Sequence, residues 1–252
     1  MDDWPLETDY QSHSIKSPYH SKNEDRCILL GHKNDRVKKL NRGEIFAVFD
    51  GMGSAPRGAE AAQHMCDKLT RLFLQSTEPT LEDVKKILFK ANMTLSKWEQ
   101  TNPNADEGAC AGTVVWIKGL SMTVFHAGDT MGVMLPFDAE RDSAFNLFTP
   151  VQASGHILTN YFGMGSNLEI HISTQRLDDG DVIILFSDGI IEGINLATVA
   201  TRTHSWLQRN VGHAVTSLCE LAKQQGSRDD ITAVMIELVY QDLNPITCCF
   251  YV

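Results

Sequence analysis

Acidic residues stand at the ends of the most apolar stretches of this sequence, where their oxygens suit a hard metal cation. The apolar run over residues 45–49 ends abruptly on Asp50, and Gly51, Met52 and Gly53 follow. The glycines let the backbone take positive φ and let another group come close, so the Asp50 carboxylate and the Gly51 carbonyl can face one small ligand. Hard cations bind oxygen, and this turn offers it in two forms. An ordinary turn is the alternative interpretation of these residues alone.

Three further acidic positions repeat this arrangement next to predicted strands: Asn23-Glu24-Asp25 before residues 27–30, Ser187-Asp188-Gly189 after residues 182–186, and Asp229-Asp230 before residues 231–238. The continuous apolar run 182–186 predicts a strand that is buried on both faces. These carboxylates are far apart in sequence, yet strand ends can bring them together. Because placing them beside buried strands has a desolvation cost, a bound divalent metal is the usual means of offsetting it.

Apolar residues at helical spacing predict four long helices that must support these strands. The first covers residues 57–74. The second begins at Thr80, which forms a capping-box pattern with Asp83, and its apolar stripe runs to Trp98. Two more helices are expected around residues 196–208 and from Val211 to a stop at Gly226.

Alternating apolar residues predict most of the remaining strands. Residues 110–135 are typical of an antiparallel meander, in which Ala127-Gly128-Asp129 makes the second turn. Strands are also expected over residues 169–174 and 182–186, with the turn Asp178-Asp179-Gly180 between them. Composition and periodicity therefore support a mixed α+β domain.

The composition limits the class of protein. The chain has 252 residues, of which 42% are apolar, and we expect one domain over residues 1–240 followed by a tail over 241–252. A net charge of -10 argues against nucleic acid as the main partner. No stretch approaches the apolar length of a membrane span. Six cysteines without framework spacing predict free thiols and a cytoplasmic location.

Taken in order, the short motifs resemble those of the PPM (PP2C-type) metal-dependent protein serine/threonine phosphatases: Asn23-Glu24-Asp25, Val48-Phe49-Asp50-Gly51-Met52-Gly53, Gly112-Thr113, Ala127-Gly128-Asp129, Ser187-Asp188-Gly189 and Asp229-Asp230-Ile231-Thr232. The resemblance spans residues 11–238, and Met52 is similar to the bacterial branch of the family. It implies a PP2C-like β-sandwich of two antiparallel sheets flanked by helices on both faces, with metals at one edge.

The resemblance also implies a binuclear centre of Mn²⁺ or Mg²⁺. Asp50 would bridge the two ions, Asp188 and Asp229 would complete one, and Glu24 with the Gly51 carbonyl the other. These ligands are hard oxygens, which suit Mg²⁺ or Mn²⁺ better than zinc. Asp50, Asp188 and Asp229 are therefore the expected catalytic residues.

Further roles follow from the same resemblance. Asp25 would contact the metal ligands without binding an ion itself. Asp129 would help Asp188 hold a third, more weakly bound ion. A water shared by the two central ions would attack the phosphorus of phosphoserine or phosphothreonine on a protein substrate, counteracting a serine/threonine kinase.

The chain departs from the family pattern at His20, where the family usually has an arginine that holds substrate phosphate. His20 and Lys22 are the candidates for that contact, and ordinary exposed charges are the alternative. A non-catalytic pseudophosphatase that binds phosphoproteins is the competing function, but every principal carboxylate is present. The chain has no Walker loop, HExxH helix or GxSxG elbow that would indicate another enzyme class.

Overall fold

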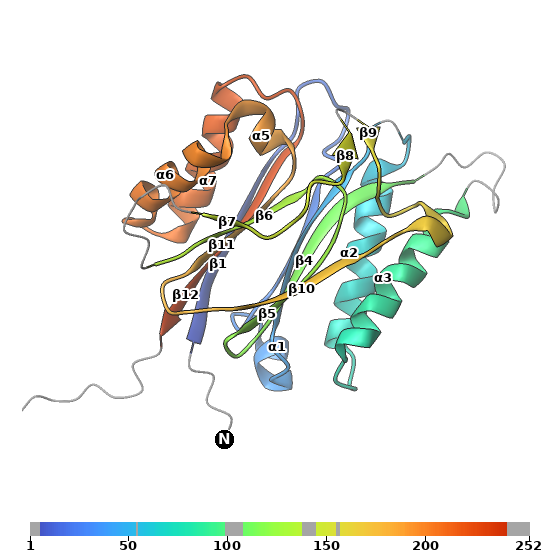
Figure 1. Ribbon diagram of the computed structural model, residues 1–252, viewed down its shortest axis with the longest axis horizontal. Helices are drawn as coiled ribbons and strands as arrows, with labels where there is room; N and C mark the ends of the chain where they lie inside the picture. Colours follow the sequence, from blue (N-terminus) through green and yellow to red (C-terminus); the bar gives the residue numbers. More distant parts are fainter. Residues whose placement is uncertain (1–5, 54, 99–107, 138–144, 155–156, 241–252) are drawn as a thin grey trace, which may run out of the picture.

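Two packed antiparallel sheets form the centre of the structure, a computed structural model that describes residues 6–53, 55–98, 108–137, 145–154 and 157–240 (Figure 1). The first sheet has the strand order β1 (Leu6–Ile15), β12 (Ile231–Tyr240), β11 (Val182–Phe186), β6 (Met131–Leu135) and β7 (Asn146–Leu147). The second sheet has the order β10 (His171–Arg176), β5 (Ser121–Ala127), β4 (Cys110–Lys118), β3 (Glu44–Gly51) and β2 (Arg26–Leu30). A separate hairpin joins β8 (Ala153–Ser154) to β9 (Ile157–Leu158). The tail expected over residues 241–252 lies outside the described residues.

Helices cover the outer face of each sheet, which confirms the predicted β-sandwich with helices on both faces (Figure 1). The second sheet is covered by α2 (Gly58–Leu74) and α3 (Leu81–Leu95). The first sheet is covered by α5 (Gly189–Gly193), α6 (Leu196–Leu207) and α7 (Val211–Gln224). The sequence interpretation missed the shortest elements, which are too short to show a periodic pattern: α1 (Asp35–Leu40), α5, the 3₁₀ turn η1 (Gly165–Asn167), β7, β8 and β9.

The alternation of side chains along β3 places Asp50 in the layer between the sheets. Phe46 and Val48 belong to the apolar cluster between the sheets, whereas Ala47 and Phe49 belong to the cluster under α2 and α3. Because side chains alternate faces along a strand, Asp50 continues the row of Phe46 and Val48. The strand therefore delivers this carboxylate to the open end of the central layer.

Two predicted strand connections are wrong. The segment 131–135 does not complete a meander with β5, because β6 pairs with β11 in the other sheet. Likewise, Asp178-Asp179-Gly180 does not close a hairpin, because β10 pairs with β5 while β11 lies in the first sheet. Periodicity predicts strands without identifying their partners, and runs that are buried on both faces fit either sheet. Asp129 consequently lies where the chain crosses between sheets, next to Gly128 at φ +113°.

The capping box that the sequence predicts at Thr80 is confirmed. The Thr80 hydroxyl accepts a hydrogen bond from the Asp83 amide at 3.1 Å, and the Asp83 carboxylate accepts one from the Thr80 amide at 3.0 Å. Within the described residues, no helix combines the length and apolar character needed to cross a bilayer. The described cysteines are free thiols: Cys27, Cys66, Cys110 and Cys219.

The capping box gives a test of the local structure. Thr80→Ala removes the hydroxyl that accepts from the first turn of α3, so it should lower the free energy of unfolding by about 1 kcal/mol in urea denaturation. The control is Thr94→Ala, because the Thr94 hydroxyl donates to the Lys90 carbonyl within the same helix. That variant should change stability by less than about 0.5 kcal/mol. Equal losses in both variants would contradict a specific role for the cap.

Candidate metal centre

Carboxylates from both sheets meet at one end of the sandwich. Asp50 ends β3, Asp188 follows β11, Asp229 precedes β12, and Glu24 lies in the loop before β2. The negative charges of Asp25, Asp188, Asp129 and Asp229 all act on Asp50, so the structure brings these acidic residues together. The adjacency is tertiary, because each residue comes from a different strand end.

Gly51 allows the close approach on which this end of the sandwich depends. A Cβ atom at Gly51 would lie 2.4 Å from the carbonyl carbon of Gly58 at the start of α2, and 2.8 Å from the Glu24 carbonyl oxygen. Any side chain would therefore push β3 away from both neighbours. Glycine at this position holds the candidate carbonyl ligand beside the Glu24 loop.

The carboxylates at this end of the sandwich form an acidic cluster that is electrostatically unfavourable on its own: Glu24, Asp25, Asp50, Asp129, Asp188 and Asp229. Burial, reinforced by the charges of Asp25 and Asp188, raises the pKa of Asp50 well above its usual range. Burial also raises the pKa of Asp25 and the pKa of Asp188 to about 7 each. The pKa values of Glu24, Asp129 and Asp229 are raised as well, in each case mainly by burial. The cluster therefore needs protons or bound cations to offset its negative charge.

The oxygens in the cluster fit a divalent cation. Among the described residues, Glu24 Oε2, Asp25 Oδ1 and Asp188 Oδ1 are buried without a hydrogen-bond partner. Unpaired, negatively charged oxygens in a buried position are the ligands that Mg²⁺ and Mn²⁺ prefer. The second oxygen of Asp25 is fixed by the Ser187 hydroxyl, which donates to it at 2.7 Å. The residues present therefore suit the metals that the sequence predicts.

Asp230 has an organising role that the sequence did not reveal. Its Oδ1 accepts from the Ser17 amide at 2.7 Å, and its Oδ2 accepts from the Glu24 amide at 2.7 Å. His20 Nδ1 lies 3.0 Å from the same Oδ2. His20, Asp229 and Asp230 also present ligand atoms within 4.8 Å of one another. Because the Asp230 oxygens already accept these hydrogen bonds, we assign Asp230 to holding the Glu24 loop and not to a separate cation site.

The two candidates for phosphate binding, His20 and Lys22, lie beside the cluster, and each already contacts an acidic residue of the chain. The hydrogen bond to Asp230 raises the pKa of His20 and occupies its Nδ1. Lys22 Nζ pairs with the Glu60 carboxylate at 2.8 Å. Arg26, an alternative cation for the phosphate, instead donates to the carbonyls of Asn23 at 2.8 Å and Asp25 at 2.6 Å and so holds the backbone on both sides of Glu24.

The turn that carries Asp129 is fixed from two sides. The Gly128 amide donates to Gln152 Oε1 at 2.9 Å, and the Gln152 amide returns a bond to the Gly128 carbonyl at 3.1 Å. On the other side, the Thr130 hydroxyl is 2.8 Å from that of Thr113. The Asp129 carboxylate is therefore presented by a rigid crossover between the sheets.

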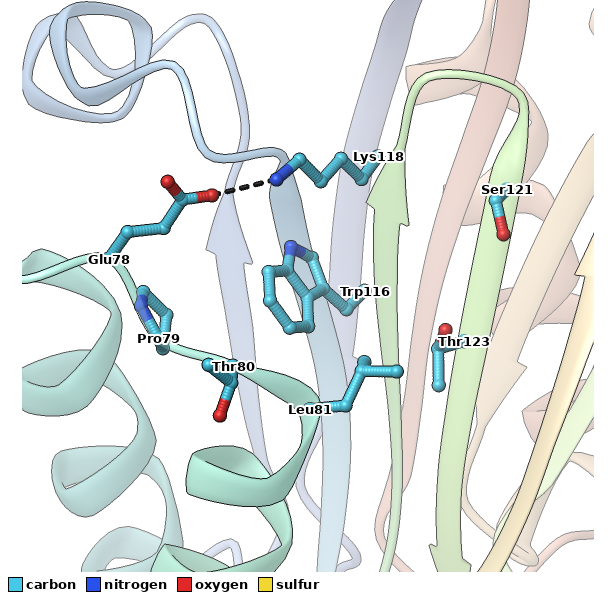
Figure 2. Close-up of a pocket in the computed structure, with 8 residues that line it drawn as sticks. All are labelled: Glu78, Pro79, Thr80, Leu81, Trp116, Lys118, Ser121 and Thr123. Carbon is cyan, nitrogen blue, oxygen red and sulfur yellow. Dashed lines mark hydrogen bonds and ion pairs between the residues drawn. The ribbon is translucent and has the colours of Figure 1, made fainter.

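A separate open pocket of about 500 Å³ lies between the start of α3 and the β4–β5 hairpin (Figure 2). Its lining includes Trp116 and one carboxylate, Glu78, which pairs with Lys118 at 2.7 Å. At about 3.3 Å per residue along β4, Lys118 is roughly 20 Å from Ala111, the residue that pairs with Asp50. This pocket is thus remote from the acidic cluster and lacks its chemistry.

The raised pKa values predict how stability depends on pH without metal. A carboxyl group with a higher pKa in the folded chain than in the unfolded chain stabilises the fold while it is protonated. That contribution is complete below about pH 4 and is lost as the pH rises towards about 7, where Asp25 and Asp188 titrate. In chelator, Tm should therefore be lower at pH 8 than at pH 5.

Asp50→Asn should reduce this fall in Tm, because it removes one charge from the cluster. Scanning fluorimetry at both pH values measures the difference. The control is Glu82→Gln, which removes an exposed carboxylate on α3 and should leave the wild-type pH dependence intact. A fall in Asp50→Asn as large as that in wild type would contradict the electrostatic account.

Solved structures share the fold over nearly the whole chain. The catalytic domain of the serine/threonine protein phosphatase PstP, in complex with two manganese ions, is 21% identical with a TM-score of 0.75, covering 93% of this chain and 99% of that chain. PstP/Ppp from Mycobacterium tuberculosis is 20% identical with a TM-score of 0.75, covering 92% and 99%. PppA, a regulatory component of T6SS in Pseudomonas aeruginosa, is 19% identical with a TM-score of 0.74, covering 92% and 98%.

No curated protein sequence matches the chain significantly. The family model described as protein phosphatase 2C matches residues 22–225, which include the Glu24 loop, the Asp50 turn, the Asp129 crossover and Asp188. Because this match covers most of the sequence, the chain belongs to the protein phosphatase 2C family.

Proposed function

We propose that this protein hydrolyses phosphoserine and phosphothreonine on proteins phosphorylated by a serine/threonine kinase. The observation that carries the proposal is the convergence of acidic side chains from both sheets. Two of the proposed ligands, Glu24 and Asp188, have buried oxygens that lack a hydrogen-bond partner in the described structure. Family membership supports a phosphatase, and the manganese ions bound by PstP support a divalent cofactor.

The ligand assignment is the one that the family resemblance implies, applied to the side chains that the structure brings together. Asp50, at the centre of the cluster, would contact both of two Mn²⁺ or Mg²⁺ ions; Asp188 and Asp229 would hold one ion, and Glu24 with the Gly51 carbonyl the other. When bound, these cations would lower the pKa of a coordinated water and neutralise charge on the phosphoryl group. A third ion, if bound, would use Asp129 with Asp188.

The other residues position the ligands and the substrate. Ser187 fixes Asp25, which supports the ligands without needing to touch an ion. Asp230 holds the Glu24 amide, so Glu24 keeps its orientation. His20 uses Nδ1 towards Asp230, which leaves Nε2 to donate to a phosphate oxygen. Lys22 is the second candidate, and it would have to leave its exposed partner Glu60 to reach the phosphate.

A turnover assay tests the proposal. Purified protein should hydrolyse p-nitrophenyl phosphate and a phosphothreonine peptide with Mn²⁺ or Mg²⁺, lose activity in chelator, and regain it when metal is restored. Asp50→Asn should lose about 100-fold or more in kcat, because a neutral amide cannot replace the charge of a bridging ligand. Phosphopeptide binding without metal-dependent turnover would instead favour a pseudophosphatase.

The proposed ligand assignment also predicts a ranking. Asp188→Asn and Asp229→Asn should each lower kcat severely even at saturating Mn²⁺, because both residues belong to the central pair of ions. Asp129→Asn should mainly raise the Mn²⁺ concentration needed for half-maximal activity, because Asp129 stands on the crossover turn and serves only a third ion. A kcat loss in Asp129→Asn equal to that in Asp188→Asn at saturating metal would contradict the ranking.

A further inference from the structure

Tyr19 and Arg228 form an exposed pair at the rim of the acidic cluster. The Arg228 guanidinium lies 5.9 Å from the centre of the Tyr19 ring, and the Tyr19 side chain is 69% exposed. Arg228 immediately precedes Asp229, and Tyr19 immediately precedes His20. We infer that this pair binds the substrate chain beside the phosphorylated residue, with Arg228 recognising an acidic side chain. The inference rests on the proposed phosphatase function and adds a substrate preference to it.

A single buried serine ties the two residues together. The Ser17 hydroxyl donates to the Arg228 carbonyl and accepts from the Tyr19 amide at 3.1 Å. Ser17 is 1% exposed, and its amide donates to Asp230 at 2.7 Å. The backbones of Tyr19 and Arg228 are therefore fixed relative to each other and to the acidic cluster.

A second anchor holds Arg228 from the other side. Glu192, on α5, accepts through one oxygen from the Arg228 amide at 2.8 Å and from the Asp229 amide at 3.0 Å. The same oxygen accepts from the Ser227 hydroxyl at 3.1 Å. Because the backbone is already ordered, binding a peptide here needs little further ordering of the loop.

Arg228 is available to another molecule, whereas neighbouring cations are engaged within the chain. Lys22 pairs with Glu60, Arg26 donates to backbone carbonyls, and Lys16 donates to the carbonyls of Ser17 and His20. In the described part of the chain, the Arg228 guanidinium contacts the Tyr19 ring and forms no ion pair. It can therefore bind an oxyanion without breaking an existing ion pair.

The location of the Arg228 guanidinium favours contact with a substrate residue next to the phosphorylated one over contact with the reacting phosphate. The guanidinium stands over an exposed ring at the rim, while the neighbouring Asp229 carboxylate belongs to the cluster. A chain with net charge -10 and an acidic cluster would repel an acidic peptide. The Arg228 guanidinium, which stands beside the cluster, offsets that repulsion locally. The Tyr19 ring offers an apolar surface to the peptide beside it.

Three substrates test the inference: a phosphothreonine peptide with glutamates on both sides, the matched peptide with glutamines, and p-nitrophenyl phosphate. Arg228→Gln should raise KM for the glutamate peptide by about two- to fivefold, the loss of one exposed ion pair. The other two KM values should change less. At high salt the difference between the peptides should shrink, because exposed charges are screened.

Tyr19 is tested in the same assay. Tyr19→Ala should raise KM for both peptides relative to p-nitrophenyl phosphate, and Tyr19→Phe should keep the wild-type values because it retains the ring. The matched control is Arg176→Gln, an exposed arginine on β10 opposite Ser121 and remote from the cluster. It should leave all three KM values unchanged.

The outcomes separate this surface from the proposed function. An equal rise in KM for all three substrates in Arg228→Gln would assign Arg228 to the reacting phosphate and overturn the inference, as would no change in any KM. If wild type shows no metal-dependent turnover, the proposed function fails. Fluorescence anisotropy with labelled peptides then still tests whether Tyr19 and Arg228 bind the peptide. In the Asp50→Asn background, Arg228→Gln should weaken binding of the glutamate peptide more than that of the glutamine peptide. An equal loss of affinity for both peptides, or no loss for either, would overturn the inference.

Discussion

The mutual repulsion of the buried carboxylates has to be offset before this fold can be stable at neutral pH. Burial and neighbouring charge raise the pKa of Asp50 well above its usual range, and the pKa values of Asp25 and Asp188 to about 7. A fold that gathered these groups without a compensating cation would be less stable at neutral pH. The arrangement suits a metal-binding site, because bound divalent cations would offset the negative charge of the carboxylates.

The scaffold resists that repulsion by fixing backbone at each point where a carboxylate enters. The β-sandwich supplies strand ends whose apolar residues are fully buried, such as Phe49 and Phe186. Hydrogen bonds then hold the connecting loops: Asp230 binds the amides of Ser17 and Glu24, and Gln152 binds both backbone groups of Gly128. These hydrogen bonds thus hold the loops that carry the acidic side chains, while apolar packing stabilises the domain.

The same loops connect the centre to its rim. Ser17 bonds to Asp230 on one side and to the backbone of Tyr19 and Arg228 on the other, so one buried residue links the Glu24 loop with the surface proposed to meet the substrate. The open pocket near Trp116 lies at the other end of β4. Substrate recognition and metal binding are therefore expected at the same end of the sandwich.

Local patterns in the sequence were enough to predict the longer strands, the long helices and the acidic residues at strand ends, but not the two-residue strands β7, β8 and β9. Apolar alternation and the glycines after Asp50 are local properties, and the ordered motifs carried the family resemblance. Tertiary structure decided which strands pair: β6 and β11 lie in the first sheet although β5 and β10 precede them in the second. It also set the contacts among Asp230, Ser17 and Arg228, because a hydrogen bond spanning some 200 residues leaves no periodic signal in the sequence. Local patterns specify which face of a strand is buried, but only packing specifies what that face meets.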